Sequence, residues 1–163
     1  MNLTGETIEI PVQIGERARQ EVLEAADPWD ARHLYLNIED ISGETNPGTV
    51  YRMYLNLPPD AGSEELERHY LGELSFFGLE RAAQPGPDAH PHGMRFSVEV
   101  GDLIRILRDD TDWDREQLRL CLRPVVPKPP AGVSEAEAEK LLAPYRSGHE
   151  PVKVGRVSLS IDA

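Results

Sequence analysis

The sequence predicts a mainly β protein, an antiparallel β-sandwich with two or three short helices. Three observations lead to this prediction: about seven short segments with strict apolar alternation, turn residues between them, and only brief helical patterns. Alternation places every second side chain on the same face of a strand, so each segment can bury one face and expose the other. Strands of this kind are typical of two sheets packed face to face.

The first half of the chain contains four of these strands and one helical pattern. Apolar residues alternate from Ile8 to Ile14, and Pro11 predicts that this segment lies at a sheet edge. Residues 15–27 then have the spacing of a short amphipathic helix. Three more strands are predicted, with these residues facing the core: Leu34, Leu36 and Ile38; Tyr51, Met53, Leu55 and Leu57; Tyr70, Leu74 and Phe76.

The second half continues with three strands, a helix and a long insert. Residues 94–100 alternate, 101–110 form a brief helix, and Leu118, Leu120 and Leu122 face inward, which puts Cys121 on the polar face. The Pro-rich insert at about 124–150 contains a capping box, Ser134 to Glu137, that opens a helical turn or two. In the last strand the alternation changes phase at Gly155, which predicts a β-bulge.

Length, charge and cysteine content limit the possible classes. A chain of 163 residues is expected to form one domain, 1–163, that includes the insert. A net charge of −12 argues against nucleic acid, and the 17 scattered basic residues do not suggest binding to anionic lipid. A single cysteine excludes an intrachain disulfide. The chain lacks a signal peptide pattern and any membrane-spanning apolar run, so a cytoplasmic protein is expected.

Residues of catalytic type do not form a recognisable motif, and no catalytic residue is predicted. The acidic pairs around Trp113, residues 109–114, are interpreted as a solvated turn, because Asp favours turns. Cys121 has no base beside it in the sequence, so we expect an inert, half-exposed thiol.

One segment has the composition of a metal site. His90, His92 and Met94 occupy every second position, and neutral imidazoles with a thioether suit copper, especially Cu(I). The structural alternative is that Met94 begins an alternating strand and faces the core, while Pro91 and Gly93 make the histidine segment an irregular loop. Both interpretations stay open. No other cofactor is expected in the domain itself.

Several motifs together resemble a known family. They are YRMYLNLP at 51–58, YLGEL at 70–74 and VGRV at 154–157. In this order and spacing they are similar to the V-N-x-P, F-A-G-x-F and I-G-x-V motifs of the non-catalytic domain that follows the catalytic domain in tyrosinases and polyphenol oxidases, particularly the bacterial ones. The resemblance runs from about residue 5 to the end of the chain.

The resemblance implies both a fold and a role. Domains of this family are β-sandwiches, similar in role to the third domain of arthropod hemocyanins, that pack over a two-copper centre and shield it until activation. They place a side chain, often aromatic, in the substrate pocket. Phe77 and Tyr145 are the candidates here, and the alternative for each is packing at a strand edge. The implied partner is a tyrosinase-type catalytic domain in the same or a separate chain, where the copper would be bound.

Three hypotheses follow for the function. The first is a domain that shields and regulates a phenol oxidase; the chain has five histidines and no H-x-x-x-H pair, so it is not expected to be the oxidase. The second is a copper-carrying accessory protein that uses His90, His92 and Met94. The third is a stand-alone interaction module without a link to copper. We take the first as the prediction.

Overall fold

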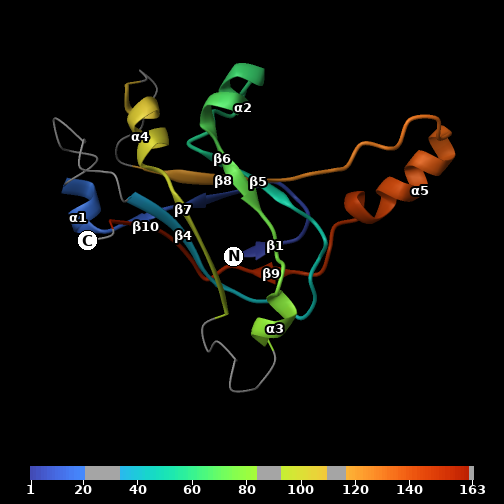
Figure 1. The fold of residues 1–163 in the computed structure, drawn as a ribbon, viewed down its shortest axis with the longest axis horizontal. Helices are drawn as coiled ribbons and strands as arrows, with labels where there is room; N and C mark the ends of the chain where they lie inside the picture. The colour runs from blue at the N-terminus through green and yellow to red at the C-terminus, as the bar shows by residue number, and fades with distance from the viewer. Residues whose placement is uncertain (21–33, 84–92, 110–116, 162–163) are drawn as a thin grey trace.

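The structure is a computed structural model that describes residues 1–20, 34–83, 93–109 and 117–161 (Figure 1). Two four-stranded sheets pack face to face, and a two-stranded pair lies beside them. Most strand pairs are antiparallel, so the predicted antiparallel β-sandwich is confirmed.

The first sheet contains the last strand of the chain near its centre. Neighbouring strands are antiparallel except for one short parallel pair at the edge, β3 with β10, which alternation alone does not predict. In strand order, the sheet consists of β3 (Gln13–Ile14), β10 (Arg156–Ile161), β4 (Leu34–Ile41) and β7 (Met94–Glu99).

The second sheet is antiparallel throughout. In strand order, it consists of β2 (Ile8–Pro11), β8 (Arg119–Pro124), β5 (Tyr51–Leu55) and β6 (Tyr70–Leu74). Pro11 lies in an outer strand, as predicted. Proline has no backbone N–H, so it fits a strand that has a neighbour on one side only. The separate two-stranded sheet joins β1 (Asn2–Leu3) to β9 (Val152–Lys153).

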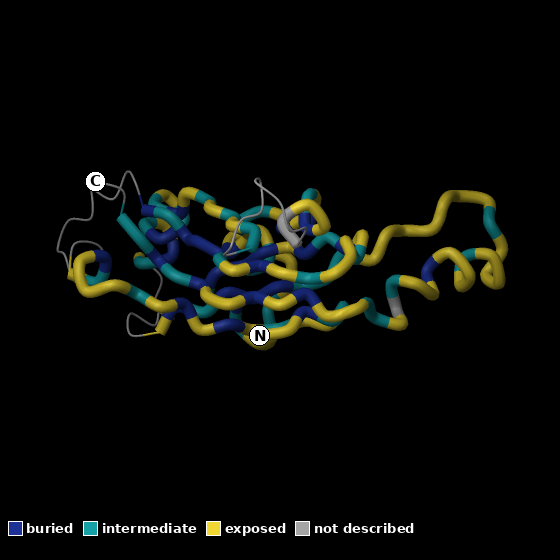
Figure 2. The backbone as a smooth tube through the Cα atoms, turned by 90° about the horizontal axis from the view of Figure 1, so that it is seen from below, coloured by how far each residue is buried: buried dark blue, intermediate teal, exposed yellow. Residues whose placement is uncertain are grey.

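The core lies between the two large sheets. Leu36 and Ile38 of β4 and Met53 and Leu55 of β5 are fully buried, and the alternate side chains of the strands face outward. Figure 2 shows buried backbone concentrated in the layered strands, with exposed backbone around them. Each fully buried aliphatic side chain contributes about 1.5–3 kcal/mol to stability, so alternation is the main determinant of this fold.

The chain passes between sheets at two short junctions. Val12 separates β2 from β3 and donates its N–H to Leu118 O at 2.8 Å. Val154 and Gly155 separate β9 from β10, and Gly155 donates its N–H to Glu39 O at 3.1 Å. The bulge predicted at Gly155 is therefore wrong in detail: the alternation changes phase there because the two strands belong to different sheets.

Two residues that were predicted to face the core lie on the opposite side of the sheet. Leu57 packs outside the main core with Tyr54, because Asn56 has a φ of +50° and reverses the alternation. Tyr70 is 43% exposed, because the register of β6 against β5 shifts by one residue at Leu71. Both departures turn side chains towards the outer face of the second sheet.

The described residues form five short helices, more than the two or three predicted. The helix expected at 101–110 is confirmed and buries Ile104 and Leu107, and only the start of the helix expected at 15–27 lies within the described residues. None of the described helices is long and apolar enough to cross a membrane. The five are α1 (Glu16–Ala18), α2 (Ser63–His69), α3 (Leu79–Ala83), α4 (Gly101–Arg108) and α5 (Glu135–Arg146).

Candidate functional site

Phe77 projects from the turn between β6 and α3. Its side chain is 85% exposed, the largest exposed fraction among the large hydrophobic residues that the structure describes. The strand-edge packing considered as an alternative for Phe77 is absent, since so little of the ring is covered. An exposed aromatic ring of this kind is a typical contact residue for another protein.

The turn that carries Phe77 is fixed on both sides. Phe76 is 1% exposed and packs edge to face on Tyr51, with ring centroids 6.0 Å apart. Leu79 is fully buried, and its N–H donates to Phe76 O at 3.1 Å. Gly78 supplies the φ of +89° that closes the turn. Phe77 is therefore held outward by buried neighbours rather than left on a loose loop.

Tyr145, the second candidate, lies in a different part of the molecule. It belongs to α5, in the insert, and its side chain is half-buried. Figure 1 shows α5 extending away from the sheets, far from α3 and the turn before it. The two aromatic candidates thus belong to separate protrusions, and Phe77 is the more accessible one.

The predicted copper segment lies largely outside the described residues. His90 and His92 fall in the gap at 84–92, so their placement is not tested. Met94 begins β7, opposite Ile41, and packs partly buried against the core. In the parts of the chain that are described, no three His, Cys, Asp or Glu side chains gather as a metal site. The copper site stays a prediction.

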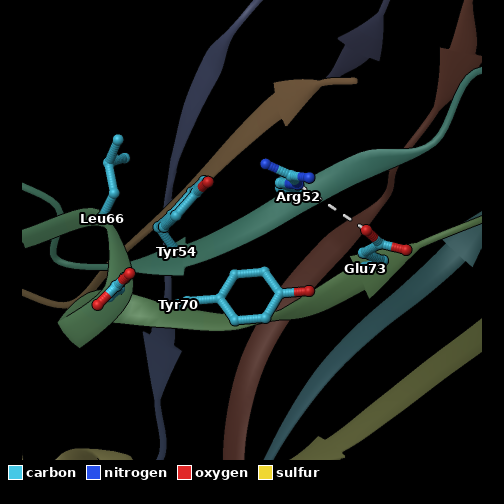
Figure 3. Close-up of a pocket in the computed structure, with 6 residues that line it drawn as sticks. Arg52, Tyr54, Leu66, Tyr70 and Glu73 are labelled. Atoms are coloured by element: carbon cyan, nitrogen blue, oxygen red, sulfur yellow. Dashed lines mark ion pairs between the residues drawn. The ribbon is translucent and has the colours of Figure 1, made fainter. Parts of the chain in front are cut away.

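A groove of about 410 Å³ lies on the outer face of the second sheet, between α2 and strands β5 and β6 (Figure 3). Tyr54 is opposite Tyr70 in the strand register, and their rings meet edge to face with centroids 5.8 Å apart. Leu66 of α2 adds an aliphatic wall. The outward turn of Tyr70 at the register shift is what creates this aromatic lining.

Charged side chains of both signs border the groove. Arg52 Nε lies 3.8 Å from Glu73 Oε1, and both side chains are about half-exposed. Such an ion pair at the surface contributes little to stability, about 0–1 kcal/mol. Glu67 also lines the groove. Two rings, an aliphatic wall and charges that remain accessible suit non-covalent contact with a side chain or small molecule rather than catalysis.

A small second cluster lies beneath this groove and corrects the expectation for Cys121. The Cys121 side chain is 3% exposed and packs with Tyr54 and Leu57, whereas a half-exposed thiol was predicted. Burial raises the pKa of the Cys121 thiol, with a smaller opposing effect of Arg123. Arg123 also lies over the Tyr54 ring, 5.8 Å from its centroid. The thiol is therefore protonated near neutral pH and poorly nucleophilic.

A polar hollow of about 660 Å³ lies against the first sheet. Its charges are mutually compensated: Glu39 accepts a hydrogen bond from Arg156 Nε at 2.8 Å and lies 3.7 Å from Arg95 Nε. Arg95 also donates to Asn37 Oδ1 at 2.9 Å. These bonds connect β4, β7 and β10 on their outer face and account for the buried Asn37.

The base of the insert is attached to the core by a hydrogen-bonded pair. Tyr51 Oη and His149 Nε2 are 2.6 Å apart, and Gly5 N–H donates to the same hydroxyl at 2.8 Å. His149 Nδ1 lies 2.6 Å from Glu150 O, an acceptor, so Nδ1 carries the proton and Tyr51 donates to Nε2 in the neutral ring. Burial raises the pKa of Tyr51, and its bond from Gly5 acts in the opposite direction.

The sequence offers Phe77 as a candidate, together with Tyr145, but does not predict the groove. Alternation marks Arg52 and Tyr54 as outward residues of one strand, which was the only available signal. It cannot show that Tyr70, predicted to face inward, lies beside Tyr54. That pairing depends on the register shift at Leu71, a tertiary feature.

Comparison in sequence finds a family and a relative. The family described as "Domain of unknown function (DUF7868)" matches residues 1–161. The chain is also 29% identical over 111 residues to a protein named tyrosinase HcTyr1 from Hahella sp. (strain CCB-MM4). The aligned part is 68% of this chain and 23% of that protein.

Comparison in fold finds polyphenol oxidase structures. Recombinantly expressed latent aurone synthase (polyphenol oxidase) matches 97% of this chain with a TM-score of 0.52 and 14% identity. The form co-crystallised with hexatungstotellurate(VI) and soaked in H₂O₂ matches 100% of the chain, with a TM-score of 0.53 and 13% identity. The chain covers 24% and 26% of these two structures.

These similarities confirm the predicted resemblance to tyrosinase and polyphenol oxidase proteins. The chain spans about a quarter of the length of the tyrosinase and of each of the two structures. What it shares with the aurone synthases is the fold, whereas the likeness to the tyrosinase extends to the sequence.

Proposed function

Because this chain belongs to the family described as a domain of unknown function (DUF7868), and resembles a quarter of a tyrosinase, we propose that it is a non-catalytic domain that shields a di-copper site. The site would belong to a tyrosinase-type catalytic domain, in the same chain or a separate one. The observation that carries the proposal is Phe77, an 85% exposed ring on a turn fixed by buried neighbours.

The names of the structural relatives support this role. They are called latent, and this chain has the fold of about a quarter of such a latent protein. A part of that size, without a catalytic motif of its own in the sequence, suits a cover rather than the reactive portion. The same fold can host other functions, so the proposal depends on Phe77 as well.

The physical mechanism is exclusion of the substrate. A stable interface buries roughly 1,200–2,000 Å² in total, enough to close the mouth of a pocket that admits a phenol ring. Phe77 is the residue we expect inside that pocket, because its ring is similar in shape and apolar character to a phenol. The turn holds it in place, so insertion requires little ordering of the domain, and ordering is a main cost of binding.

The proposal is tested by inhibition of a copper-loaded tyrosinase catalytic domain. Monophenol oxidation is followed by absorbance while this chain is titrated as a separate protein. We expect turnover to fall to a low plateau with the wild-type chain. With Phe77→Ala, the plateau is several-fold higher, because the cover still binds but leaves the pocket open.

The matched control is Ile106→Ala, which truncates another exposed hydrophobic residue, 53% exposed on α4. This variant should inhibit like the wild type. Unchanged turnover with a saturating wild-type chain would show that shielding is wrong. Equal plateaus for the wild type and Phe77→Ala would remove Phe77 from the role while leaving the cover itself in place.

A further inference from the structure

The insert forms an arm that extends beyond the sandwich. Residues 125–150 leave β8 and return to β9, and between them α5 lies away from both sheets (Figures 1 and 2). α5 makes no extensive contact with any described strand or helix. The arm is nevertheless fixed at both ends: Val125 N–H donates to Val50 O at 2.8 Å, and His149 is bonded to Tyr51.

The helix in the arm has an apolar stripe without a core to face. Ala138, Leu141, Leu142 and Tyr145 have the spacing i, i+3, i+4 and i+7, the pattern of a helix that packs against a larger apolar surface. Only Leu142 is buried, and Leu141 is 51% exposed. Val126, at the start of the arm, is 45% exposed. The stripe is thus half-covered by this chain.

A helix of this length is marginal without packing. α5 has 12 residues, and isolated helices shorter than about 12–15 residues are only partly formed in water. Pro144 lies inside the helix and cannot donate the backbone bond of its position. Ser134 caps the first turn by accepting from Glu137 N–H at 3.3 Å. The apolar stripe therefore needs a second surface for the helix to be well ordered.

Charge limits what that surface can be. The exposed side of α5 begins with Glu135, Glu137 and Glu139, and the whole chain has a net charge of −12. α5 also carries Lys140 and Arg146, so the repulsion comes from the chain as a whole: its net negative charge would repel both a second copy and an anionic membrane. A different protein with a neutral or basic rim around an apolar patch has the matching chemistry.

From these observations we propose that the arm, residues 125–150, is the element that docks the tyrosinase-type catalytic domain, with the Leu141 edge of α5 in contact with it. This inference depends on the proposed shielding function and adds the surface that provides affinity. Phe77 and the arm then have separate tasks: Phe77 occludes the pocket, and the arm holds the cover on its partner.

The test uses the same titration with two readouts, the dissociation constant and the residual turnover at saturation. Leu141→Gln is expected to raise the dissociation constant roughly tenfold, as truncation of an interface hot spot does, and to leave the plateau unchanged. Lys140→Gln is the matched control, because it introduces glutamine at the neighbouring exposed position. This variant should bind like the wild type. Phe77→Ala should instead change the plateau.

A second measurement covers the arm as a whole. Hydrogen exchange of α5 should be fast in the free chain and slow in the complex, and replacement of 127–147 by a short Gly/Ser linker should abolish tight binding. Binding of the linker variant or Leu141→Gln within twofold of the wild type overturns the docking role while the shielding function stands. No binding by the wild type overturns both. A concentration-dependent dimer of the free chain that Leu141→Gln removes would also overturn the docking role, since a second copy would then be the occupant.

Discussion

At the scale of single residues, the backbone passes very close to a neighbouring side chain at Gly155. A Cβ at this position would lie 2.5 Å from Asp40 Cβ and 3.0 Å from Asp40 Oδ2. Asp40 itself has a φ of +56°, a conformation that side chains other than glycine adopt at a cost. Gly155 therefore allows the chain to pass from β9 to β10 directly beside β4.

We predict that Gly155→Ala destabilises the protein by about 1–3 kcal/mol, because the added methyl group forces the backbone away from Asp40. Urea unfolding measures the loss. Adding Asp40→Gly should restore much of the stability, since it removes the Cβ that clashes and relieves the positive φ. Gly15→Ala is the control, because no atom lies within 4 Å of a Cβ there. Equal stability of Gly155→Ala and the wild type would refute the clash.

Cys121 provides a second test at the same scale. Its thiol is buried and its pKa is raised by burial, so the thiolate that reacts is rare in the native state. At about pH 8, we expect a disulfide reagent to label Cys121 at least roughly tenfold more slowly in the native protein than in urea. The measurement is the absorbance of the released thiolate. Similar labelling rates in the native and the unfolded protein would contradict this prediction and would mean that the cluster of Tyr54, Leu57 and Cys121 opens readily.

At the scale of elements, α5 differs from α4 in depending on its own cap. α4 buries Ile104 and Leu107 in the core, whereas α5 buries only Leu142 and packs on no other element extensively. Local interactions therefore set how well α5 is formed, and its loss exposes little of the main core. We therefore expect α5 to unfold separately from the sandwich.

Ser134→Ala should weaken α5 by about 1 kcal/mol, the usual contribution of a helix N-cap. Amide exchange at residues 138–142 should then be about fivefold faster, while the urea midpoint of the whole protein stays the same. Ser134→Asp, which can still accept from Glu137 N–H, should exchange like the wild type. A lowered urea midpoint in Ser134→Ala would show that the arm and the sandwich unfold together.

At the scale of the whole molecule, the N-terminal segment and the insert meet at one buried hydroxyl. Tyr51, in the central part of the second sheet, is bonded to Gly5 near the N-terminus and to His149 at the base of the arm. Its ring also packs on Phe76 behind the Phe77 turn. A single side chain thus connects the sandwich to both protrusions considered above.

The raised pKa of Tyr51 predicts loss of stability at high pH. Its folded pKa lies above the unfolded value of about 10, so its contribution is complete below about pH 10 and is lost as pH rises through the folded pKa. Urea unfolding from neutral to alkaline pH measures this. Tyr51→Phe should be about 1–3 kcal/mol less stable at neutral pH, because Gly5 N–H loses its acceptor, and should lose less stability above about pH 10. Parallel pH curves for the two proteins would contradict the prediction.

Much of the fold could be predicted because it follows from local burial patterns. The alternation at Leu36 and Ile38, and at Met53 and Leu55, identifies strands whose inward residues are fully buried. α2 was missed because its sequence, SEELERH, is almost entirely polar and has no apolar stripe. α3 was missed because five residues are too few to show a helical period.

For the candidate site, the family resemblance suggested an aromatic residue, and the position of Phe77 on the polar face beside Phe76 made it one of two candidates; its exposure is observed, and its place in a substrate pocket stays a prediction. The positions of Leu57 and Tyr70 could not be predicted, since each depends on a backbone irregularity at a neighbour, Asn56 or Leu71. The burial of Cys121 could not be predicted either, because it arises only when Tyr54 and the displaced Leu57 gather over β8.

By itself the sequence determined the two-layer β fold and the outward position of Phe77, because both follow from hydrophobic periodicity over a few neighbouring positions, and it determined the edge position of Pro11, because proline has no backbone N–H. Only the tertiary structure decided that the chain changes sheets at Val12 and Gly155, that Tyr54 meets Tyr70, and that α5 lies beyond the core. The physical reason is that these features depend on the register and spacing between segments distant in sequence, which residue patterns within one segment do not encode.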